Sequence, residues 1–494
     1  MNRQCSHSLW LRLGPGAIIA SLTIGSGELI FSTRAGALFG PKVVWFFCLV
    51  CLLKWVLLYT TGRQMILRGI HPMESWTRLP GPRGWLPVSF LLLGIPCFPI
   101  WVAFHANTTA SLLPGGFVMG WHAGMLWPYL LLLLCAVLSI AGQYKWLEKI
   151  QLLLVSLLLG IAMVALFLVS PQFMDWGRLA IPWGDWVYPE WIESYPSFTQ
   201  RPVWVELSTY VGIIGGSSYD YLCYVSFLRE KGWGRAGFDA WEINPRGAVS
   251  RAKVSPQVSA SDMADAMTSL RWDTCMSFLS VFFFSVVFVV LGHEVLAPKG
   301  QVPVDGQLLS MQAYVVSDQW PGMRKIFQVG AFAAMLGTLY GTLEVGPRIF
   351  VEAARAMGWQ RWTAKRHQSH KKWVLAIAVG SMLVVASTQW AAASGKTFSF
   401  IWLLTPANLF TGVFGCGVVL WATLWIAFRP PEGMSGFLAR FWKWLMIPAG
   451  LIFLLLGIKG YLDFGGGGAL LILAGSFGLG MAWARWVDQR RGFL

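Results

Sequence analysis

The chain has 494 residues, of which 56% are hydrophobic and 12% are charged, and its mean hydropathy is +0.57. A composition this apolar excludes a soluble globular protein and indicates a membrane protein with several spanning helices. The formal net charge of +15 does not require nucleic acid as a partner, because most Lys and Arg residues fall on one side of the membrane once both termini are placed in the cytoplasm.

Apolar stretches of about 20 residues, the length that crosses a bilayer as a helix, recur along the whole sequence. We predict about twelve such helices, and in chain order they cover 13–37, 42–62, 85–113, 122–141, 147–169, 203–228, 272–293, 326–353, 373–394, 398–427, 441–461 and 464–484. We therefore expect an all-α polytopic protein in the lipid bilayer of the plasma (cell inner) membrane, with both termini in the cytoplasm.

The first predicted helix contains an interruption. The stretch SLTIGSGELIF, residues 21–31, places two glycines and a serine in the middle of the helix and follows them with Glu28. Glycine weakens a helix, and a carboxylate inside a membrane is costly and usually functional. We expect the helix to unwind here and Glu28 to meet a cation, with pairing to Arg34 or Lys54 as the alternative.

A similar interruption occurs in the sixth predicted helix. The stretch IIGGSSYDYL, residues 213–222, combines Gly215 and Gly216 with Asp220. Two Gly-interrupted helices at corresponding positions are typical of transporters built from inverted repeats, and their separation by five helices fits a 5+5 repeat. The predicted parts are a first repeat (1–170), an external loop (171–202), a second repeat (203–430) with a cytoplasmic loop (229–271), and two further helices with the C-terminal tail (431–494).

The two breaks together predict a cation site. Unwound backbone leaves carbonyl groups without helical partners, which a membrane tolerates only where they line a cavity or meet an ion. Carbonyl and carboxylate oxygens suit a hard divalent cation. We expect a metal site made of Glu28, Asp220, Gly25 and Ser218, with the further substrate-contacting residues Ser26, Gly215, Gly216, Ser217, Tyr219 and, at a kink after Pro406 in the tenth helix, Asn408.

Other polar residues in the predicted helices have simpler interpretations. Glu344 and Arg348 are four residues apart and are expected to form an ion pair within one helix. His105 is predicted to lie in the middle of the membrane, either hydrogen-bonded or as a proton relay. Lys54 and Arg34 are expected to act as counter-charges to the acids of the site. No phosphate-binding loop, H-E-x-x-H or nucleophile-elbow motif occurs, so neither an enzyme nor a cofactor is expected.

The sequence resembles a known family of transporters. The stretch LGPGAIIASLTIGSGELIFSTRAGALFGPKVVW is similar to the first helix of the Nramp (natural-resistance-associated macrophage protein) divalent-metal transporters, and LLYTTGRQMILRG, residues 57–69, looks like the end of the family's second helix. GTLYGTLEVG and the helix with Asp220 occupy the positions of the eighth and sixth helices. The resemblance implies a LeuT-type fold with helices 1 and 6 broken, metal transport and a monomer.

The chain also departs from that family. Where Nramp proteins carry Asp-Pro-Gly-Asn, this sequence has residues 25–28, GSGE, and the family's Met-Pro-His aligns with Ser218-Tyr219-Asp220. The third helix has no acid where the family has residues associated with proton transfer. These changes resemble the magnesium-transporting branch related to Nramp.

We therefore predict a carrier for Mg²⁺, with Mn²⁺ or Ca²⁺ as further candidates, working by alternating access without proton coupling. The alternative is a LeuT-fold carrier of an organic cation or amino acid, because fold does not decide substrate. A sensor that retains the fold is a third candidate, but it would be expected to carry a soluble output domain.

Overall fold

A computed structural model describes most of the chain. It covers residues 14–115, 117–118, 121–141, 186–199, 201–237, 241–243, 249–251, 258–303, 323–359, 366–395, 400–427 and 437–491, with scattered residues between 153 and 167. The predicted helix at 147–169 and the first half of the predicted loop 171–202 lie largely outside the described residues.

The elements follow the predicted order of membrane helices. The first predicted helix consists of α1 (Pro15–Thr23), the π-helix η2 (Ile24–Ser32) and α2 (Thr33–Phe39). The second, third and fourth are α3 (Val43–Arg68), α5 (Trp85–Ala110) and α6 (Ala123–Ala141). The sixth consists of α10 (Val203–Ile213) and α11 (Ser218–Lys231). The others are α12 (Ala260–Leu291), α14 (Met323–Ala356), α16 (Arg366–Ala393), α17 (Phe400–Asn408) with π-helix η9 (Leu409–Phe414) and α18 (Gly415–Ala427), and α19 (Phe437–Arg491).

Short elements connect these helices. They are η3 (Gly40–Lys42), α4 (Pro72–Ser75), η4 (Trp76–Arg78), η5 (Glu190–Ser194), α9 (Pro196–Thr199), η6 (Gly234–Gly237), the π-helix η7 (Gly292–Leu296) and η8 (Ala297–Lys299). Two small antiparallel hairpins pair β1 (Phe117–Val118) with β2 (Trp121–His122) and β3 (Trp241–Ile243) with β4 (Val249–Arg251).

The helices are long and apolar enough to span a membrane. In the part of the chain that the structure describes, 8 helical segments meet that requirement by length and composition. Two of them, Ile18–Arg68 and Phe441–Gln489, each hold two predicted spans. In α19 the division falls at Gly465 and Gly466, whose backbone is not helical. The halves of the sixth helix are not among the 8, because each is too short alone.

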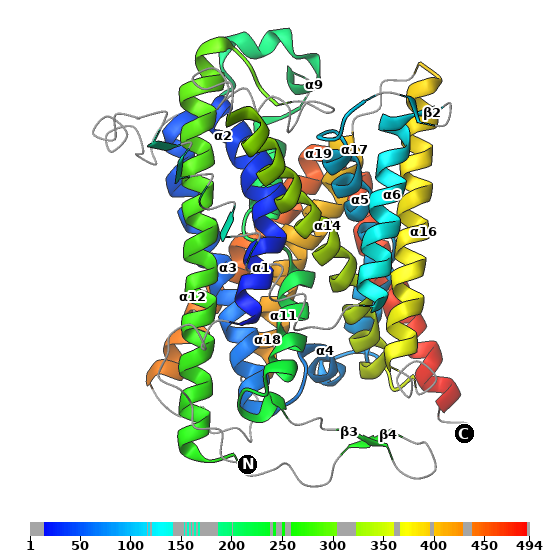
Figure 1. Ribbon diagram of the computed structural model, residues 1–494. Coiled ribbons are helices and arrows are strands. Elements are labelled where there is room, and N and C mark those ends of the chain that lie inside the picture. Colours follow the sequence, from blue (N-terminus) through cyan, green and yellow to red (C-terminus); the bar gives the residue numbers. More distant parts are fainter. Residues whose placement is uncertain are drawn as a thin grey trace.

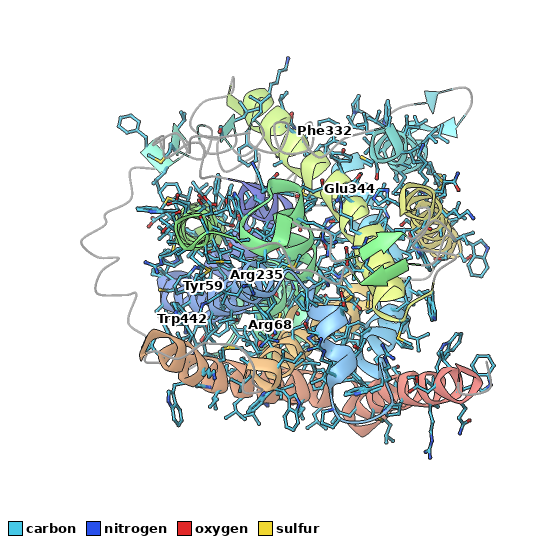
Figure 2. All side chains as sticks on the ribbon, turned by 90° about the horizontal axis from the view of Figure 1, so that it is seen from below. Tyr59, Arg68, Arg235, Phe332, Glu344 and Trp442 are labelled. Atoms are coloured by element: carbon cyan, nitrogen blue, oxygen red, sulfur yellow. The ribbon has the colours of Figure 1, made fainter. Side chains whose placement is uncertain are left out.

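The helices form two groups that meet at the centre of the molecule (Figure 1). In one group α12 packs against α1, α3 and the π-helix η2, while α11 packs against α3. In the other, α5, α6, α14 and α16 all pack against one another. The first helix touches α14 across the boundary, and α19 covers α5 and α18. Seen from below, Tyr59 of α3 meets Trp442 at the start of α19, with ring centroids 4.5 Å apart (Figure 2).

Close contacts explain some of the glycines. A Cβ at Gly36 would lie 2.2 Å from the Val289 carbonyl oxygen, and one at Gly292 would lie 2.0 Å from that of Thr33. The backbones of the first helix and α12 therefore touch, as small residues permit in membrane helices.

The two predicted breaks differ. The sixth helix is interrupted at residues 214–217 as expected, and both Gly215 (φ 78°) and Gly216 (φ 94°) adopt left-handed backbone conformations. The first helix does not unwind, because its chain continues as a nine-residue π-helix over Ile24–Ser32. The wider π-helical winding changes the backbone at the predicted place but keeps a helical hydrogen-bond pattern.

Candidate functional site

The break in the sixth helix positions Asp220. Ser217 is the N-cap of α11, and its Oγ accepts a hydrogen bond from the Asp220 backbone N–H at 3.4 Å. In return Asp220 Oδ2 accepts one from the Ser217 N–H at 2.6 Å. This reciprocal capping box fixes the carboxylate at the positive end of the helix dipole. Asp220 is half-buried, so part of its carboxylate remains open to a neighbouring space.

That space is a cavity of about 50 Å³ between the two groups of helices. The first helix, α5, the sixth helix, α14 and η9 all contribute to its wall. Every lining residue is buried or half-buried. The polar or sulfur-bearing side chains of the lining are those of Thr23, Ser26, Cys97, His105, Ser217, Tyr219, Asp220, Thr342 and Thr411, together with the indole of Trp101.

Glu28 does not line this cavity. It is fully buried, and its Oε1 accepts a hydrogen bond from the Gly215 backbone N–H at 3.2 Å. Its Oε2 has no hydrogen-bond partner among the described residues. Glu28 of the first helix thus contacts the break in the sixth helix, in agreement with the prediction that the two interrupted segments lie together. Its carboxylate faces the backbone of that break and not the cavity.

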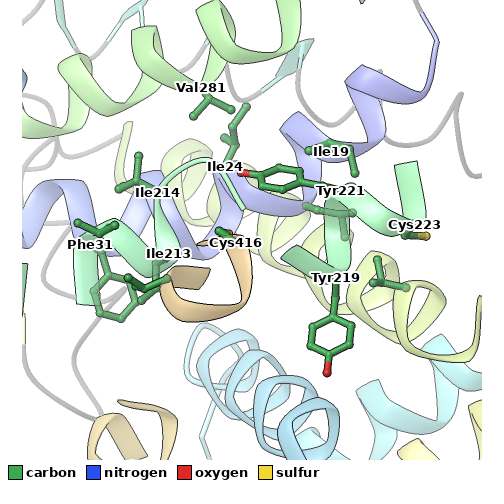
Figure 3. Close-up of a cluster of buried hydrophobic side chains, with 14 of the residues drawn as sticks. Ile19, Ile24, Phe31, Ile213, Ile214, Tyr219, Tyr221, Cys223, Val281 and Cys416 are labelled. Carbon is green, nitrogen blue, oxygen red and sulfur yellow. The ribbon is translucent and has the colours of Figure 1, made fainter. Parts of the chain in front are cut away.

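The predicted glycine carbonyls already have partners. The Gly216 carbonyl accepts hydrogen bonds from Lys54 Nζ at 2.5 Å and from the Tyr221 hydroxyl at 3.3 Å, and the Gly215 carbonyl accepts one from Tyr221 at 2.7 Å. Figure 3 shows the hydroxyl end of Tyr221 pointing toward Ile24 of the first helix, while Tyr219 points away from that helix. The Tyr219 hydroxyl donates to the Phe90 carbonyl at 2.6 Å in α5.

Three other predicted site residues have structural neighbours instead of an open face. A Cβ at Gly25 would lie 2.0 Å from Thr338 Oγ1, so Gly25 allows the first helix to approach α14. Ser218 Oγ donates to the Thr411 carbonyl at 2.7 Å, and Asn408 Nδ2 donates to the Thr209 carbonyl at 3.0 Å. None of these three belongs to the cavity wall. Ser26, Gly216, Ser217, Tyr219 and Asp220 do.

The expected counter-charge role of Arg34 is wrong. Arg34 Nε lies 2.7 Å from Glu206 Oε1, and Arg201 Nε lies 3.2 Å from Glu206 Oε2. All three side chains are buried. Sequence reasoning missed Glu206 because no glycines surround it, although a lone acid in an apolar helix was itself a signal.

Glu344 and Arg348 form the expected pair within one helix, with Arg348 Nε 3.3 Å from Glu344 Oε2. The pair belongs to a wider network, because Ser139 Oγ donates to Glu344 Oε1 at 2.6 Å and His370 Nε2 lies 3.4 Å from Glu344 Oε2. Glu344 therefore connects α14 to α6 and α16. It does not line the cavity.

Thr411 and Cys97 are among the cavity residues that were not predicted. Thr411 Oγ1 is buried without a hydrogen-bond partner in the described part of the chain, and Cys97 places a thiol in the wall. Thr411 lies in the π-helix η9, three residues after Asn408 at the end of α17, which was the predicted site residue of the tenth helix. His105 also lines the cavity, with Nδ1 lacking a partner among the described residues and its ring 5.5 Å from that of Trp101.

This arrangement can hold a small cation with water. Asp220 supplies a full negative charge, while Ser26, Ser217 and Thr411 supply hydroxyl oxygens. No group of three or more His, Cys, Asp and Glu residues that could hold a metal occurs in the described ranges. A metal here would therefore share its coordination between one carboxylate, hydroxyl groups and water.

Comparison with known proteins identifies the fold. No family model and no curated protein sequence matches the chain. Among solved structures, a mutant of the manganese transporter of Eremococcus coleocola is similar over 99% of this chain and 98% of its own, at 15% identity and a TM-score of 0.71. Mhp1, a nucleobase-cation-symport-1 family transporter with bromovinylhydantoin bound, is similar over 97% of this chain and 93% of its own, at 15% identity and a TM-score of 0.52.

The protein is thus an integral membrane protein with the LeuT-type fold of these transporters. The similarity covers almost the full length of both chains, as the sequence resemblance implied for the fold.

Proposed function

We propose that the protein transports a divalent metal cation across the plasma membrane by alternating access, as a monomer with cytoplasmic termini. The observation that carries this proposal is the cavity of about 50 Å³ at the break of the sixth helix, with the Asp220 carboxylate in its wall. The transport of manganese by a protein of similar fold over the full length supports it. Discontinuous helices near the bilayer midplane are where transporters of this kind bind ions.

The size of the cavity favours an ion over a larger solute. A cavity needs at least about 10–15 Å³ for each water molecule, so about 50 Å³ holds only a few. The six waters of a fully hydrated ion would require at least about 60–90 Å³ by the same measure. The ion would therefore lose part of its water shell and take oxygen ligands from Asp220 and the hydroxyl groups.

The donor types favour Mg²⁺, with Mn²⁺ as the next candidate. Carboxylate, hydroxyl and water oxygens suit hard cations, and the single thiol of Cys97 is a weak reason to include Mn²⁺. Transport without proton coupling is supported by α5, whose residues Trp85–Ala110 include no acid. Among the described residues His105 is the one histidine in the cavity wall, so it is the residue to test for proton transfer.

Uptake into liposomes tests the proposal. Purified protein is reconstituted with fluorescent reporters of Mg²⁺, Mn²⁺ and internal pH, and wild type is compared with Asp220→Asn. The amide retains the capping hydrogen bond but removes the charge, so we expect at least a tenfold loss of metal uptake from a folded protein. The matched control is Asp262→Asn, since Asp262 follows the Ser259 cap of α12 with the same spacing and is exposed.

The outcomes separate the parts of the proposal. Metal uptake without acidification supports an uncoupled carrier. Acidification that His105→Gln abolishes would instead establish proton coupling. If no divalent ion enters and Asp220→Asn has no effect, the metal function is refuted.

A small organic cation is the second candidate substrate. Phe98, Trp101 and Tyr219 provide aromatic faces in the same wall as Asp220, a combination that binds ammonium groups by charge and cation–π attraction. Uptake of radiolabelled ethanolamine or choline by the same liposomes, without metal uptake, would favour this alternative.

A further inference from the structure

A lysine side chain reaches the break in the sixth helix from a different helix. Lys54 lies in the middle of α3 and is fully buried. Its Nζ donates hydrogen bonds to three backbone carbonyls, those of Gly212 at 3.1 Å, Ile214 at 2.7 Å and Gly216 at 2.5 Å. An ammonium group has three donors and no acceptor, so these three carbonyls satisfy it completely.

The carbonyls are available because the helix is broken there. The last carbonyl groups of a helix have no intrahelical partner and carry the negative end of the helix dipole. At the end of α10 the left-handed conformations of Gly215 and Gly216 turn the following backbone. The Lys54 stem packs against the same turn, because a Cβ at Gly215 would lie 3.4 Å from Lys54 Cδ. The chain thus forms a cage of three oxygens.

The charges around the cage favour a cation in it. Asp220 lies at the same turn, where its Oδ2 accepts a hydrogen bond from the Ser217 N–H. Glu28 is bound to the same turn through the Gly215 N–H. An empty cage would leave three carbonyls and two neighbouring acids without a positive charge in a water-poor interior, which is costly.

We propose that Lys54 is a tethered monovalent cation that occupies an ion site at the break of the sixth helix, in the place of a dissociable ion such as Na⁺. Its ammonium group holds α10 and α11 in the orientation that presents Asp220 to the cavity. The wild-type protein therefore needs no free monovalent cation at this position. Removal of the side chain leaves a carbonyl cage that a small cation can enter.

The test measures thermal stability of the full-length protein in detergent, so it does not depend on the transported substrate. Wild type, Lys54→Ala and Lys54→Met are heated in sodium chloride, methylammonium chloride or N-methylglucamine chloride at equal ionic strength. Alanine opens the cage, whereas methionine keeps an apolar stem beside the carbonyls and serves as the matched control. A cation that binds only the folded state raises the melting temperature in a concentration-dependent manner.

We expect the melting temperature of wild type to be equal in the three salts. Lys54→Ala should be less stable in N-methylglucamine and regain stability, saturably, with Na⁺ or methylammonium. Lys54→Met should be less stable in all three salts without such recovery. If Lys54→Ala folds only when one of the small cations is present during purification, the proposal is also supported.

Other results overturn the proposal. They are recovery of folded Lys54→Ala in none of the three salts, equal stability of this variant in all three, or recovery of Lys54→Met to the same extent as Lys54→Ala. In each case Lys54 would be a packing or charge-balancing residue and not the occupant of an ion site. Because metal uptake is not part of the readout, these results leave the proposed transport function unaffected.

Discussion

The buried ion pairs of Glu206 give the sharpest prediction of stability. Arg34 from α2 approaches this carboxylate with two nitrogens, Nε at 2.7 Å from Oε1 and Nη2 at 3.0 Å from Oε2. Arg201 Nε lies 3.2 Å from Oε2. Arg201 also donates through Nη2 to Thr209 Oγ1 at 2.7 Å and to Thr405 Oγ1 at 3.1 Å. One carboxylate therefore connects the first, sixth and tenth helices.

Replacement of Glu206 by glutamine removes the negative charge and leaves two buried guanidinium groups. Removing one partner of a buried ion pair costs about 3–5 kcal/mol, because the remaining charge is not compensated. We expect Glu206→Gln to lower the free energy of unfolding by about that amount. The value can be measured by denaturant titration of the purified protein in detergent micelles, followed by tryptophan fluorescence.

Two further variants identify the cause. Glu193→Gln alters an exposed acid eight residues before Arg201 and should change stability by less than about 0.5 kcal/mol. A triple variant, Arg34→Met, Arg201→Met and Glu206→Leu, removes all the charges and should recover most of the loss. If Glu206→Gln costs less than about 1 kcal/mol, the argument from uncompensated charge is refuted.

Four other substitutions test separate features. Gly25→Ala places a Cβ against Thr338 Oγ1 and should cost about 1–3 kcal/mol of stability, whereas Gly467→Ala has no neighbour within 4 Å and should cost little. Thr411→Val should weaken metal uptake without loss of stability. The control is Thr423→Val, which should change neither uptake nor stability, because the Thr423 hydroxyl also has no hydrogen-bond partner among the described residues but does not line the cavity. His71 lies outside the spanning segments, and burial lowers its pKa to about 4. The folded protein therefore loses stability as the pH falls from about 6.5 toward 4. His71→Gln should flatten this pH dependence of the free energy of unfolding, measured by denaturant titration. Asp273→Asn should increase labelling of the cavity residue Cys97 by a membrane-impermeant thiol reagent, detected by mass spectrometry, because it weakens the cap of α1; equal labelling rates would refute this role.

The sequence predicted the break in the sixth helix because its signal is local. Glycine adopts the backbone conformations found at Gly215 and Gly216 far more readily than other residues, and a capping serine and an acid follow at helix-start spacing. The form of the first interruption could not be predicted in the same way. Glycine allows a helix to unwind but does not require it, and contact with α14 at Gly25 accounts for that glycine without unwinding.

The composition of the cavity depended on the tertiary structure. Asp220 and Ser26 could be chosen from their motifs, and both line it. Cys97 and Thr411 carry no local signal, because whether a thiol or hydroxyl in an apolar helix faces a cavity depends on how the helices pack. The partners of Lys54 were hidden for the same reason, since its three acceptors are backbone carbonyls more than 150 residues away in sequence.

Polar networks lie on both sides of the cavity residue Ser26 along the first helix. Arg34 follows Ser26 by eight residues and binds Glu206. In the other direction, the Gly14 and Gly16 N–H groups donate to the two carboxylate oxygens of Asp273 at 2.7 and 2.8 Å, and the Tyr224 hydroxyl donates to Oδ2 at 3.0 Å. Ser26 thus lies between two networks, each joining the first helix to another part of its group. Because both networks join the first helix to its own group, whereas the cavity lies between the two groups, the networks hold that group together as a unit, and movement of one group against the other need not break them.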